Sequence, residues 1–110
     1  EIYRLLRDLE SCQEASSLLV MPLHASLQPQ EQKRVLSHKE KGMRRVILST
    51  NIGETSVTIE DCVYVINTGR MKQMEYDASD DMSLLRDCWA TRDSFKQRRG
   101  RAGRVRPGVC

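Results

Sequence analysis

The spacing of hydrophobic residues changes along the chain, and it predicts an alternation of helices and strands. Apolar residues within 1–10 recur three, four and seven positions apart, which predicts an amphipathic helix. Short continuous apolar runs at 17–21, 44–49 and 62–66 predict three buried strands. A second helix is predicted over 29–36, because the proline that opens this range suits a first helical position. The alternation predicts an α/β fold with a mostly parallel sheet flanked by helices.

The second half of the chain predicts a different kind of sheet element. Two segments within about 71–90 flank the turn-forming residues 78–81, and this pattern is typical of an antiparallel β-hairpin. Thr91 or Asp93 can cap a final helix, which we expect to run through an arginine-rich stretch and to end at the Pro-Gly pair 107–108. The hairpin is therefore expected as an antiparallel insertion in a mostly parallel fold.

Two loops follow predicted strands, at the edge where parallel sheets bind ligands. The first covers 23–27, after Pro22 ends the first strand, and the second covers 50–60. The second loop is rich in small hydroxyl and amide residues, namely Thr50, Asn51, Thr55, Ser56 and Thr58. Such side chains often form caps and turns by bonding nearby backbone, so a local structural role is the alternative to ligand binding.

Composition and charge narrow the choice of partner. The 110 residues suffice for one domain or part of one, and no apolar run approaches the roughly 20 residues of a membrane span, so no membrane partner is expected. Net charge is +3, but residues 92–110 carry +6 while residues 1–91 carry −3. This asymmetry indicates an anionic partner at the basic end, with a solvated helix face as the alternative.

The four cysteines bear on metal binding and compartment. Their spacing shows no close pair of the kind found in zinc sites or redox dithiols, so no metal site is predicted. No secretory signal is visible, and a reducing intracellular compartment, cytoplasmic or nuclear, is expected.

The densest group of charges lies at 97–104. If this stretch is helical, Gln97, Arg101 and Arg104 share one face, because they are four and seven residues apart. Arginine stays charged, and its planar fork of donors suits phosphate groups. The two glycines of the stretch each cost a helix about 1 kcal/mol relative to alanine, which is easier to explain if a ligand approaches the backbone closely. A ligand with several phosphates is therefore predicted.

Three stretches together resemble motifs of a known family. Residues 49–59 (STNIGETSVTI) closely resemble motif V of the DEAH/RHA family of superfamily 2 RNA helicases, and residues 97–104 (QRRGRAGR) are similar to motif VI. Residues 23–27 (LHASL) fit the block that precedes motif V. The resemblance implies that residues 1–110 form part of the second RecA-like domain of such a helicase. This domain has a P-loop NTPase-type α/β fold, here with an inserted antiparallel hairpin.

The resemblance assigns roles around a nucleotide. Gln97 matches the glutamine that faces the γ-phosphate and positions attacking water, while Arg101 and Arg104 match two arginine fingers. Nucleotide contacts are implied for Leu36, Gly53, Ser56, Thr58 and Glu60. At three of these positions the usual residue differs: the family has alanine at 53, often aspartate at 60, and in some members an aromatic ring at 36. Because the leucine at 36 can cover a base face only without π stacking, we expect weak base selectivity, with other nucleoside triphosphates accepted besides ATP.

The resemblance also implies contacts with RNA. Thr50 matches a threonine whose hydroxyl bonds an RNA phosphate, with Asn51 beside it. Ala25 and Ser26 match a loop whose backbone approaches the strand. Contacts with phosphates position a strand without reading its sequence. The hairpin resembles the element that lies near the 5′ side of bound RNA and helps to part strands, so the expected partners are single-stranded RNA and RNA duplexes.

In this family, ATP lies between two RecA-like domains, and the first carries the phosphate loop and the DExH motif that handles Mg2+. Neither motif occurs in this sequence, so the chain alone is expected not to hydrolyse ATP. We expect the full-length protein to be an ATP-dependent RNA helicase that moves 3′ to 5′, with its first RecA-like domain as a partner of this chain. The alternative is a non-catalytic helicase-like module for RNA binding or scaffolding.

Several side chains outside these assignments allow two interpretations. His24, next to a strand end, suits a packed or capping role better than a catalytic one, because no carboxylate partner is evident. Trp89 can stack on a base or pack against the sheet. Surface solvation or helix packing is expected for the arginines off the predicted helical face, Arg98, Arg99 and Arg106.

Overall fold

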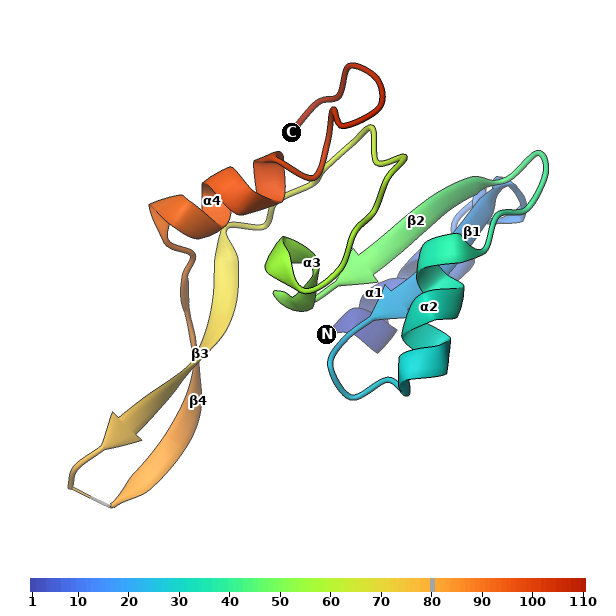
Figure 1. Cartoon of the computed structure of the whole chain (residues 1–110). Coiled ribbons are helices and arrows are strands. Elements are labelled where there is room, and N and C mark those ends of the chain that lie inside the picture. Colours follow the sequence, from blue (N-terminus) through green and yellow to red (C-terminus); the bar gives the residue numbers. More distant parts are fainter. Residues whose placement is uncertain (80) are drawn as a thin grey trace. The chain divides into compact units, whose positions relative to one another are not determined.

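The computed structural model describes residues 1–79 and 81–110, which form two compact units, Glu1–Thr58 and Ile59–Cys110 (Figure 1). Asp80, part of the predicted hairpin turn, lies outside the described residues. Each unit has its own two-stranded sheet, parallel in the first and antiparallel in the second. None of the helices in the described ranges is both long and apolar enough to cross a bilayer.

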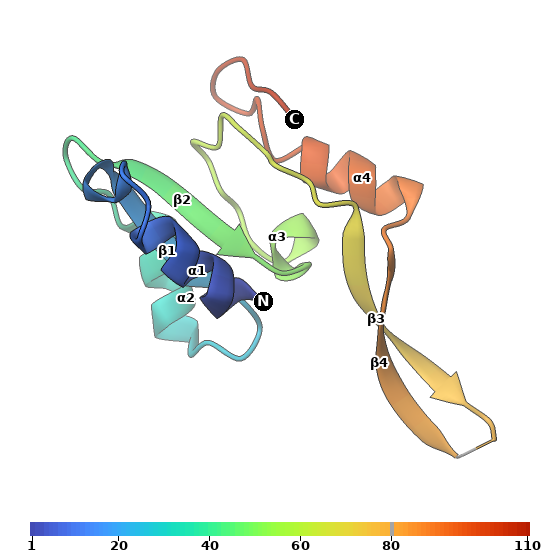
Figure 2. The same cartoon turned by 180° about the vertical axis from the view of Figure 1, so that it is seen from behind.

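The first unit is a parallel sheet between helices. Its elements, in chain order, are α1 (Ile2–Glu10), the 3₁₀ helix η1 (Ala15–Ser17), β1 (Leu18–Leu23), α2 (Pro29–Ser37), β2 (Arg44–Ser49) and α3 (Ile52–Thr55). β1 and β2 pair from Leu18 opposite Arg44 to Leu23 opposite Ser49. Figures 1 and 2, which view the chain from opposite sides, show α1 on one face of this sheet and α2 on the other. This layering is the predicted α/β arrangement.

Local sequence explains where α2 begins and what it covers. Pro29 starts the helix, and the Gln28 backbone N–H donates to the Glu31 carboxylate at 3.2 Å as part of a capping box. On its inner face, Val35 is buried, as is Leu23 at the end of β1. The buried core of this unit therefore includes Leu23, at the carboxyl end of β1, and Val35 on α2.

One strand is longer than predicted. The sequence suggests that Pro22 ends the first strand, but β1 continues through Pro22 to Leu23. Proline has no N–H to donate, and it is tolerated in a strand with a neighbour on one side only. Within the described residues of this unit, β1 pairs with β2 alone. β2, by contrast, has the predicted bounds.

The second unit is a hairpin followed by a helix. Its elements are β3 (Arg70–Asp77), β4 (Met82–Trp89) and α4 (Arg92–Arg99). The two strands pair along their whole length, with Arg70 opposite Trp89, which confirms the predicted hairpin. At the start of α4, the Thr91 hydroxyl oxygen accepts a hydrogen bond from the Ser94 backbone N–H at 3.1 Å. Thr91 rather than Asp93 is therefore the cap.

The prediction of a third buried strand at 62–66 is wrong. Within the described part of the second unit, this segment forms a single parallel bridge, between Tyr64 and Val109. The Val65 N–H donates to the Val109 carbonyl at 2.9 Å, and the Val109 N–H donates to the Val63 carbonyl at 2.8 Å. Tyr64 is 68% exposed. An apolar run becomes a regular strand only where a neighbour pairs residue after residue, and here the neighbour supplies one residue.

Candidate functional site

The loops that follow β1 and β2 meet at the carboxyl end of the parallel sheet. The Thr50 backbone N–H, directly after β2, donates to the Leu23 carbonyl at the end of β1 at 3.1 Å. The residues that the resemblance assigns to RNA lie in these two loops, and all are exposed: Ala25, Ser26, Thr50 and Asn51. They therefore lie at the edge of the sheet where α/β folds bind ligands.

His24 closes the first loop and holds it to α1. The Leu27 N–H donates to the His24 carbonyl at 3.1 Å, which forms a turn. His24 Nε2 and the Tyr3 hydroxyl hydrogen-bond at 3.1 Å, and their rings meet edge to face with centroids 5.8 Å apart. The half-buried histidine thus has a phenol rather than a carboxylate as its partner, which supports the packed interpretation.

The second loop winds into the short helix α3. Backbone N–H groups of residues 53, 54 and 56 donate to the carbonyls of residues 50, 51 and 52 at 3.0 to 3.2 Å. These bonds occupy the backbone of Thr50 and Asn51 and leave both side chains at the surface. A methyl group at Gly53 would lie 2.6 Å from Ser49 Oγ. The glycine therefore leaves room for that hydroxyl beside α3.

The residues implied in nucleotide contacts are divided between the two units. Leu36 is half-buried on α2, and its carbonyl accepts a hydrogen bond from Arg45 Nη1 at 2.8 Å. Ser56 is the exposed C-cap of α3, and Thr58 is exposed at the end of the first unit. Glu60 is exposed in the second unit. The last three side chains are therefore open to a ligand.

Residues 97–104 are not one continuous helix, so the predicted helical face is wrong. α4 ends at Arg99, with Gly100 as its C-cap. Gly103 then has a φ of +81°, a left-handed conformation that glycine adopts readily and an α-helix excludes. The predicted end of the helix at 107–108 is wrong for the same reason, since the chain has already left the helical path.

The three residues expected to meet phosphate lie in different local structures. Gln97 is exposed on the last turn of α4. Arg101 is half-buried in the turn that follows, where its N–H donates to the Arg98 carbonyl at 3.1 Å. Arg104 is exposed further along. Both arginines are thus carried by a loop, residues 100–109, which we call the arginine loop.

The arginine loop is closed onto the extended segment that precedes the hairpin. The Gly103 N–H donates to the Cys62 carbonyl at 3.4 Å, and the Val109 N–H donates to the Val63 carbonyl at 2.8 Å. A methyl group at Gly108 would lie 2.6 Å from the Gly103 nitrogen and 2.9 Å from the Val63 oxygen. Only glycine fits there without a backbone shift, so the loop is packed against its own support.

Arg98 is a structural residue of the second unit. Its Nη1 donates to Asn67 Oδ1 at 2.9 Å and to the Arg70 carbonyl at 3.0 Å. Of the two interpretations left open for the off-face arginines, packing therefore applies to Arg98, while Arg99 and Arg106 are exposed. Its role was missed because its partners lie 31 and 28 residues away in sequence, beyond the reach of any local pattern.

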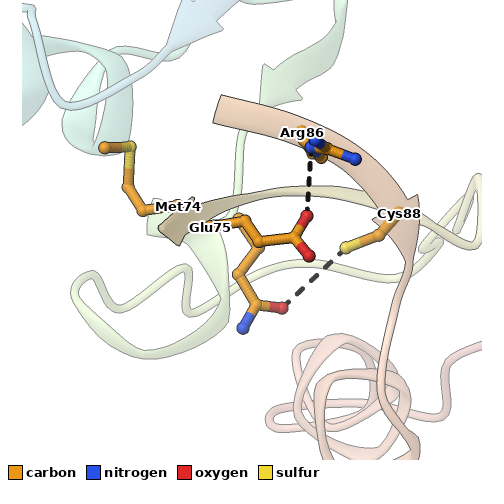
Figure 3. Close-up of a pocket in the computed structure, with 5 residues that line it drawn as sticks. Met74, Glu75, Arg86 and Cys88 are labelled. Carbon is orange, nitrogen blue, oxygen red and sulfur yellow. Dashed lines mark hydrogen bonds and ion pairs between the residues drawn. The ribbon is translucent and has the colours of Figure 1, made fainter. Parts of the chain in front are cut away.

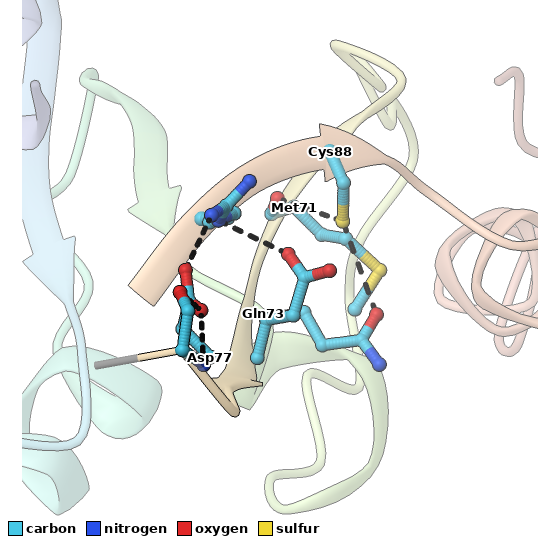
Figure 4. A network of polar contacts seen from close by, with 7 residues as sticks. Met71, Gln73, Asp77 and Cys88 are labelled. Carbon is cyan, nitrogen blue, oxygen red and sulfur yellow. Dashed lines mark hydrogen bonds and ion pairs between the residues drawn. The ribbon is translucent and has the colours of Figure 1, made fainter. Parts of the chain in front are cut away.

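The hairpin carries a hollow of about 240 Å³, lined by Gln73, Met74, Glu75, Arg86 and Cys88 (Figure 3). Arg86 Nε lies 3.2 Å from Glu75 Oε2, and Arg86 Nη2 lies 3.5 Å from Asp77 Oδ2. The Cys88 thiol donates to Gln73 Oε1 at 3.9 Å and to a backbone carbonyl at 3.6 Å (Figure 4). Because the charge of Arg86 is compensated by two carboxylates, the hollow adds little attraction for an anion.

Large apolar side chains of the hairpin are exposed, namely Met74, Tyr76, Met82, Leu84, Leu85 and Trp89. Trp89 is 73% exposed, so its interpretation as a residue packed against the sheet is wrong in this unit. The Arg70 guanidinium carbon lies 4.7 Å from the centroid of the Trp89 ring, a cation–π contact. Arg70 Nη2 also pairs with Asp87 Oδ2 at 3.2 Å, which holds the cation in place.

Comparison with known proteins decides the family. Residues 2–106 match the family described as the helicase conserved C-terminal domain. The chain belongs to this family. Among relatives of the helicase domain, the DExH-box ATP-dependent RNA helicase DExH4, chloroplastic, of Arabidopsis thaliana is 47% identical over 96 residues, 87% of this chain and 7% of that protein. The DExH-box ATP-dependent RNA helicase DExH2 of the same plant is 43% identical over 96 residues, 87% of this chain and 6% of that protein.

A solved structure of the same kind supports the fold. The crystal structure of the E. coli DExH-box NTPase HrpB is 34% identical, with a TM-score of 0.87, over 98% of this chain and 13% of the HrpB chain. The helicase C-terminal domain described here therefore has the predicted RecA-like α/β fold. The chain spans less than a tenth of the length of the curated relatives it matches.

Proposed function

We propose that this helicase C-terminal domain is one half of an ATP-driven RNA motor, the second RecA-like domain of a DEAH/RHA-type RNA helicase. The observation that carries the proposal is the arginine loop. It presents Arg101 and Arg104 from a backbone closed by hydrogen bonds and by a tightly packed glycine. Relatives of this chain are named ATP-dependent RNA helicases, which supports a nucleoside triphosphate as the phosphate ligand.

The arginine loop suits the stabilisation of charge on a phosphoryl group. Arg101 and Arg104 carry fixed positive charges, and their forked donors match phosphate oxygens. Because the backbone of the loop is held at Gly103 and Gly108, the two cations need little rearrangement before they stabilise charge on a ligand. Electrostatic catalysis requires such preorganisation. The two guanidinium groups stabilise the charge that develops as the γ-phosphoryl group passes to water and the nucleoside diphosphate leaves. We assign Gln97, at the end of α4, to orienting the attacking water.

The donor set of this chain fits the triphosphate better than a metal ion. Arginine guanidinium groups and a glutamine amide donate to phosphate oxygens. Within the described residues, no group of three or more His, Cys, Asp or Glu side chains could hold a metal ion. We therefore assign Mg2+ mainly to the first RecA-like domain of the same protein. Further contacts with ATP or another nucleoside triphosphate are assigned to Leu36, Gly53, Ser56, Thr58 and Glu60.

The strand-end loops of the first unit suit an RNA backbone. The exposed side chains of Ser26, Thr50 and Asn51 and the backbone at Ala25 lie at one edge of the sheet, joined by the hydrogen bond from Thr50 to Leu23. Hydroxyl, amide and backbone N–H groups bond phosphate oxygens without reading sequence. We assign these residues to single-stranded RNA as the motor moves 3′ to 5′.

ATPase and unwinding assays on the full-length protein test the proposal. Arg101→Ala should lower the RNA-stimulated kcat by about 10³-fold, with RNA binding retained. Arg106→Ala is the matched control, because it removes the same charge from an exposed arginine without an assigned role, and it should stay within about twofold. Unaltered turnover in Arg101→Ala would refute the assignment. RNA binding without any RNA-stimulated turnover in the wild type would instead favour a non-catalytic RNA-binding or scaffolding module.

A further inference from the structure

Helix α4 packs across the base of the hairpin in the second unit (Figure 1). Ser94 is 7% exposed, and its Oγ lies 4.0 Å from Met71 Sδ on β3. A methyl group at Gly69 would lie 3.5 Å from Phe95 Cζ and 3.6 Å from the Trp89 ring, so little space remains between the helix and the start of β3. The helix that leads into the arginine loop is therefore in side-chain contact with the hairpin.

One side chain adds hydrogen bonds to this contact. We call the hydrogen-bonded link between Arg98, Asn67 and the start of β3 the joint. Arg98 Nη1 on α4 donates to Asn67 Oδ1 at 2.9 Å and to the Arg70 carbonyl on β3 at 3.0 Å. Asn67 Oδ1 also accepts from the Gly69 N–H at 3.0 Å. The Gly69 carbonyl accepts from the Ala90 N–H, just after β4, at 2.8 Å. Arg98 is thus linked through short hydrogen bonds to both ends of the hairpin base.

The backbone of the same residue is bonded to the arginine loop. The Arg98 carbonyl accepts from the Arg101 N–H at 3.1 Å, and Gln97 precedes Arg98 on α4. A planar, charged guanidinium with two acceptors holds its geometry better than a single flexible contact. We infer that Arg98 is a positioning residue that makes the hairpin follow the arginine loop, so that strand separation stays coupled to ATP turnover. The inference rests on the proposed function and on the strand-parting role that the resemblance implies for the hairpin, and it adds a residue outside the assigned ligand contacts.

The test compares two rates in the full-length helicase, ATP hydrolysed and duplex unwound. Arg98→Gln should leave RNA-stimulated turnover within about a factor of two. It should lower the duplex unwound per ATP by roughly fivefold or more, the range expected when two coupled sites are separated. Arg99→Gln makes the same change of charge at the exposed neighbouring position and should alter neither rate.

Asn67 supplies variants from the other side of the joint. Asn67→Leu removes the acceptor and should reproduce the loss of unwinding per ATP. Asn67→Asp keeps the acceptor and replaces Nδ2, a buried atom without a hydrogen-bond partner among the described residues, so coupling should be retained. Turnover close to wild type shows that a variant is folded.

Two results overturn the inference. One is unchanged unwinding per ATP in both Arg98→Gln and Asn67→Leu, and the other is an equal loss of both rates. Failure of the proposed function gives a separate result, because it would show as wild-type turnover in Arg101→Ala.

Discussion

Replacing Gly108 with alanine should displace the arginine loop. The new methyl group would lie 2.6 Å from the Gly103 nitrogen and 2.9 Å from both Ala102 Cβ and the Val63 oxygen. Favourable contact between heavy atoms begins near about 3.5 Å, so the loop or its support must move by roughly 0.6–0.9 Å. Two of the three obstructing atoms belong to the backbone, and no side-chain rotation can relieve them.

The free-energy cost of this displacement is similar in size to the stabilisation from the hydrogen bonds that close the loop. Over-packing of a filled site typically costs about 1–3 kcal/mol. The hydrogen bonds at risk, from Gly103 to Cys62 at 3.4 Å and from Val109 to Val63 at 2.8 Å, each contribute on the order of 1 kcal/mol. These hydrogen bonds therefore do not stabilise the closed loop by enough to keep it in place when the methyl group is added. A misplacement of about 1 Å at catalytic groups can lower turnover by about 100-fold.

The assay is RNA-stimulated ATP hydrolysis by the full-length helicase, with kcat and RNA affinity measured separately. Gly108→Ala should lower kcat by about 10- to 100-fold and leave RNA affinity near wild type, because the RNA contacts are assigned to other loops. Gly42→Ala is the control, since its φ of +85° strains an alanine but the methyl group meets no atom of the described residues within 4 Å. It should keep kcat within about twofold. A Gly108→Ala enzyme with wild-type kcat would show that close packing of this loop does not hold the arginines.

Three further predictions concern local structure. Thr91→Ala removes the cap of α4 and should destabilise its first turn by about 1 kcal/mol, seen as faster amide hydrogen exchange there, with Thr91→Ser close to neutral. Gly53→Ala should cost less than about 1 kcal/mol, because the Ser49 hydroxyl can rotate away. A double-mutant cycle with Ser49→Ala should remove most of that cost, because Ser49 Cβ at 3.2 Å is then the nearest remaining atom, and additive effects would contradict the contact. The hydrogen bond to Asp81 raises the pKa of Tyr76, so this contact stabilises the hairpin below the ordinary tyrosine pKa of about 10 and is lost as pH rises through the raised value. An NMR titration should show a lower Tyr76 pKa in Asp81→Asn, and an unchanged pKa would contradict this account.

The elements that could be predicted from sequence are those with local signals. The apolar run at 44–49 and the proline at the start of α2 report on their own segments, and both elements formed as expected. Whether β1 can continue through Pro22 depends on whether strands pair with it on one side or on both. No local sequence pattern reveals this. The failed strand at 62–66 has the same cause, because its apolar residues become a ladder only if a partner strand covers them.

At the candidate site, residue types could be predicted but their arrangement could not. The glycine and arginine pattern indicated phosphate chemistry, yet the shared face assumed a helix that the left-handed backbone of Gly103 rules out. Arg98 and Arg99 are equivalent neighbours in sequence, and only the fold brings Asn67 to one of them. Likewise, Trp89 would be buried only if another element lay over it. The residues around it in sequence do not show whether one does, so its exposure could not be predicted.

The closure of the arginine loop has a consequence for its length. Gly103 and Val109 are bonded to the carbonyls of consecutive residues, Cys62 and Val63. Because both hydrogen bonds hold their residues at fixed positions, the segment between Gly103 and Val109 has to span a fixed distance with a fixed number of residues. Inserting or deleting one residue has to release an anchor or turn Arg104 to another side. In comparisons of related sequences, this stretch should vary in residue type at its exposed positions while it keeps its length.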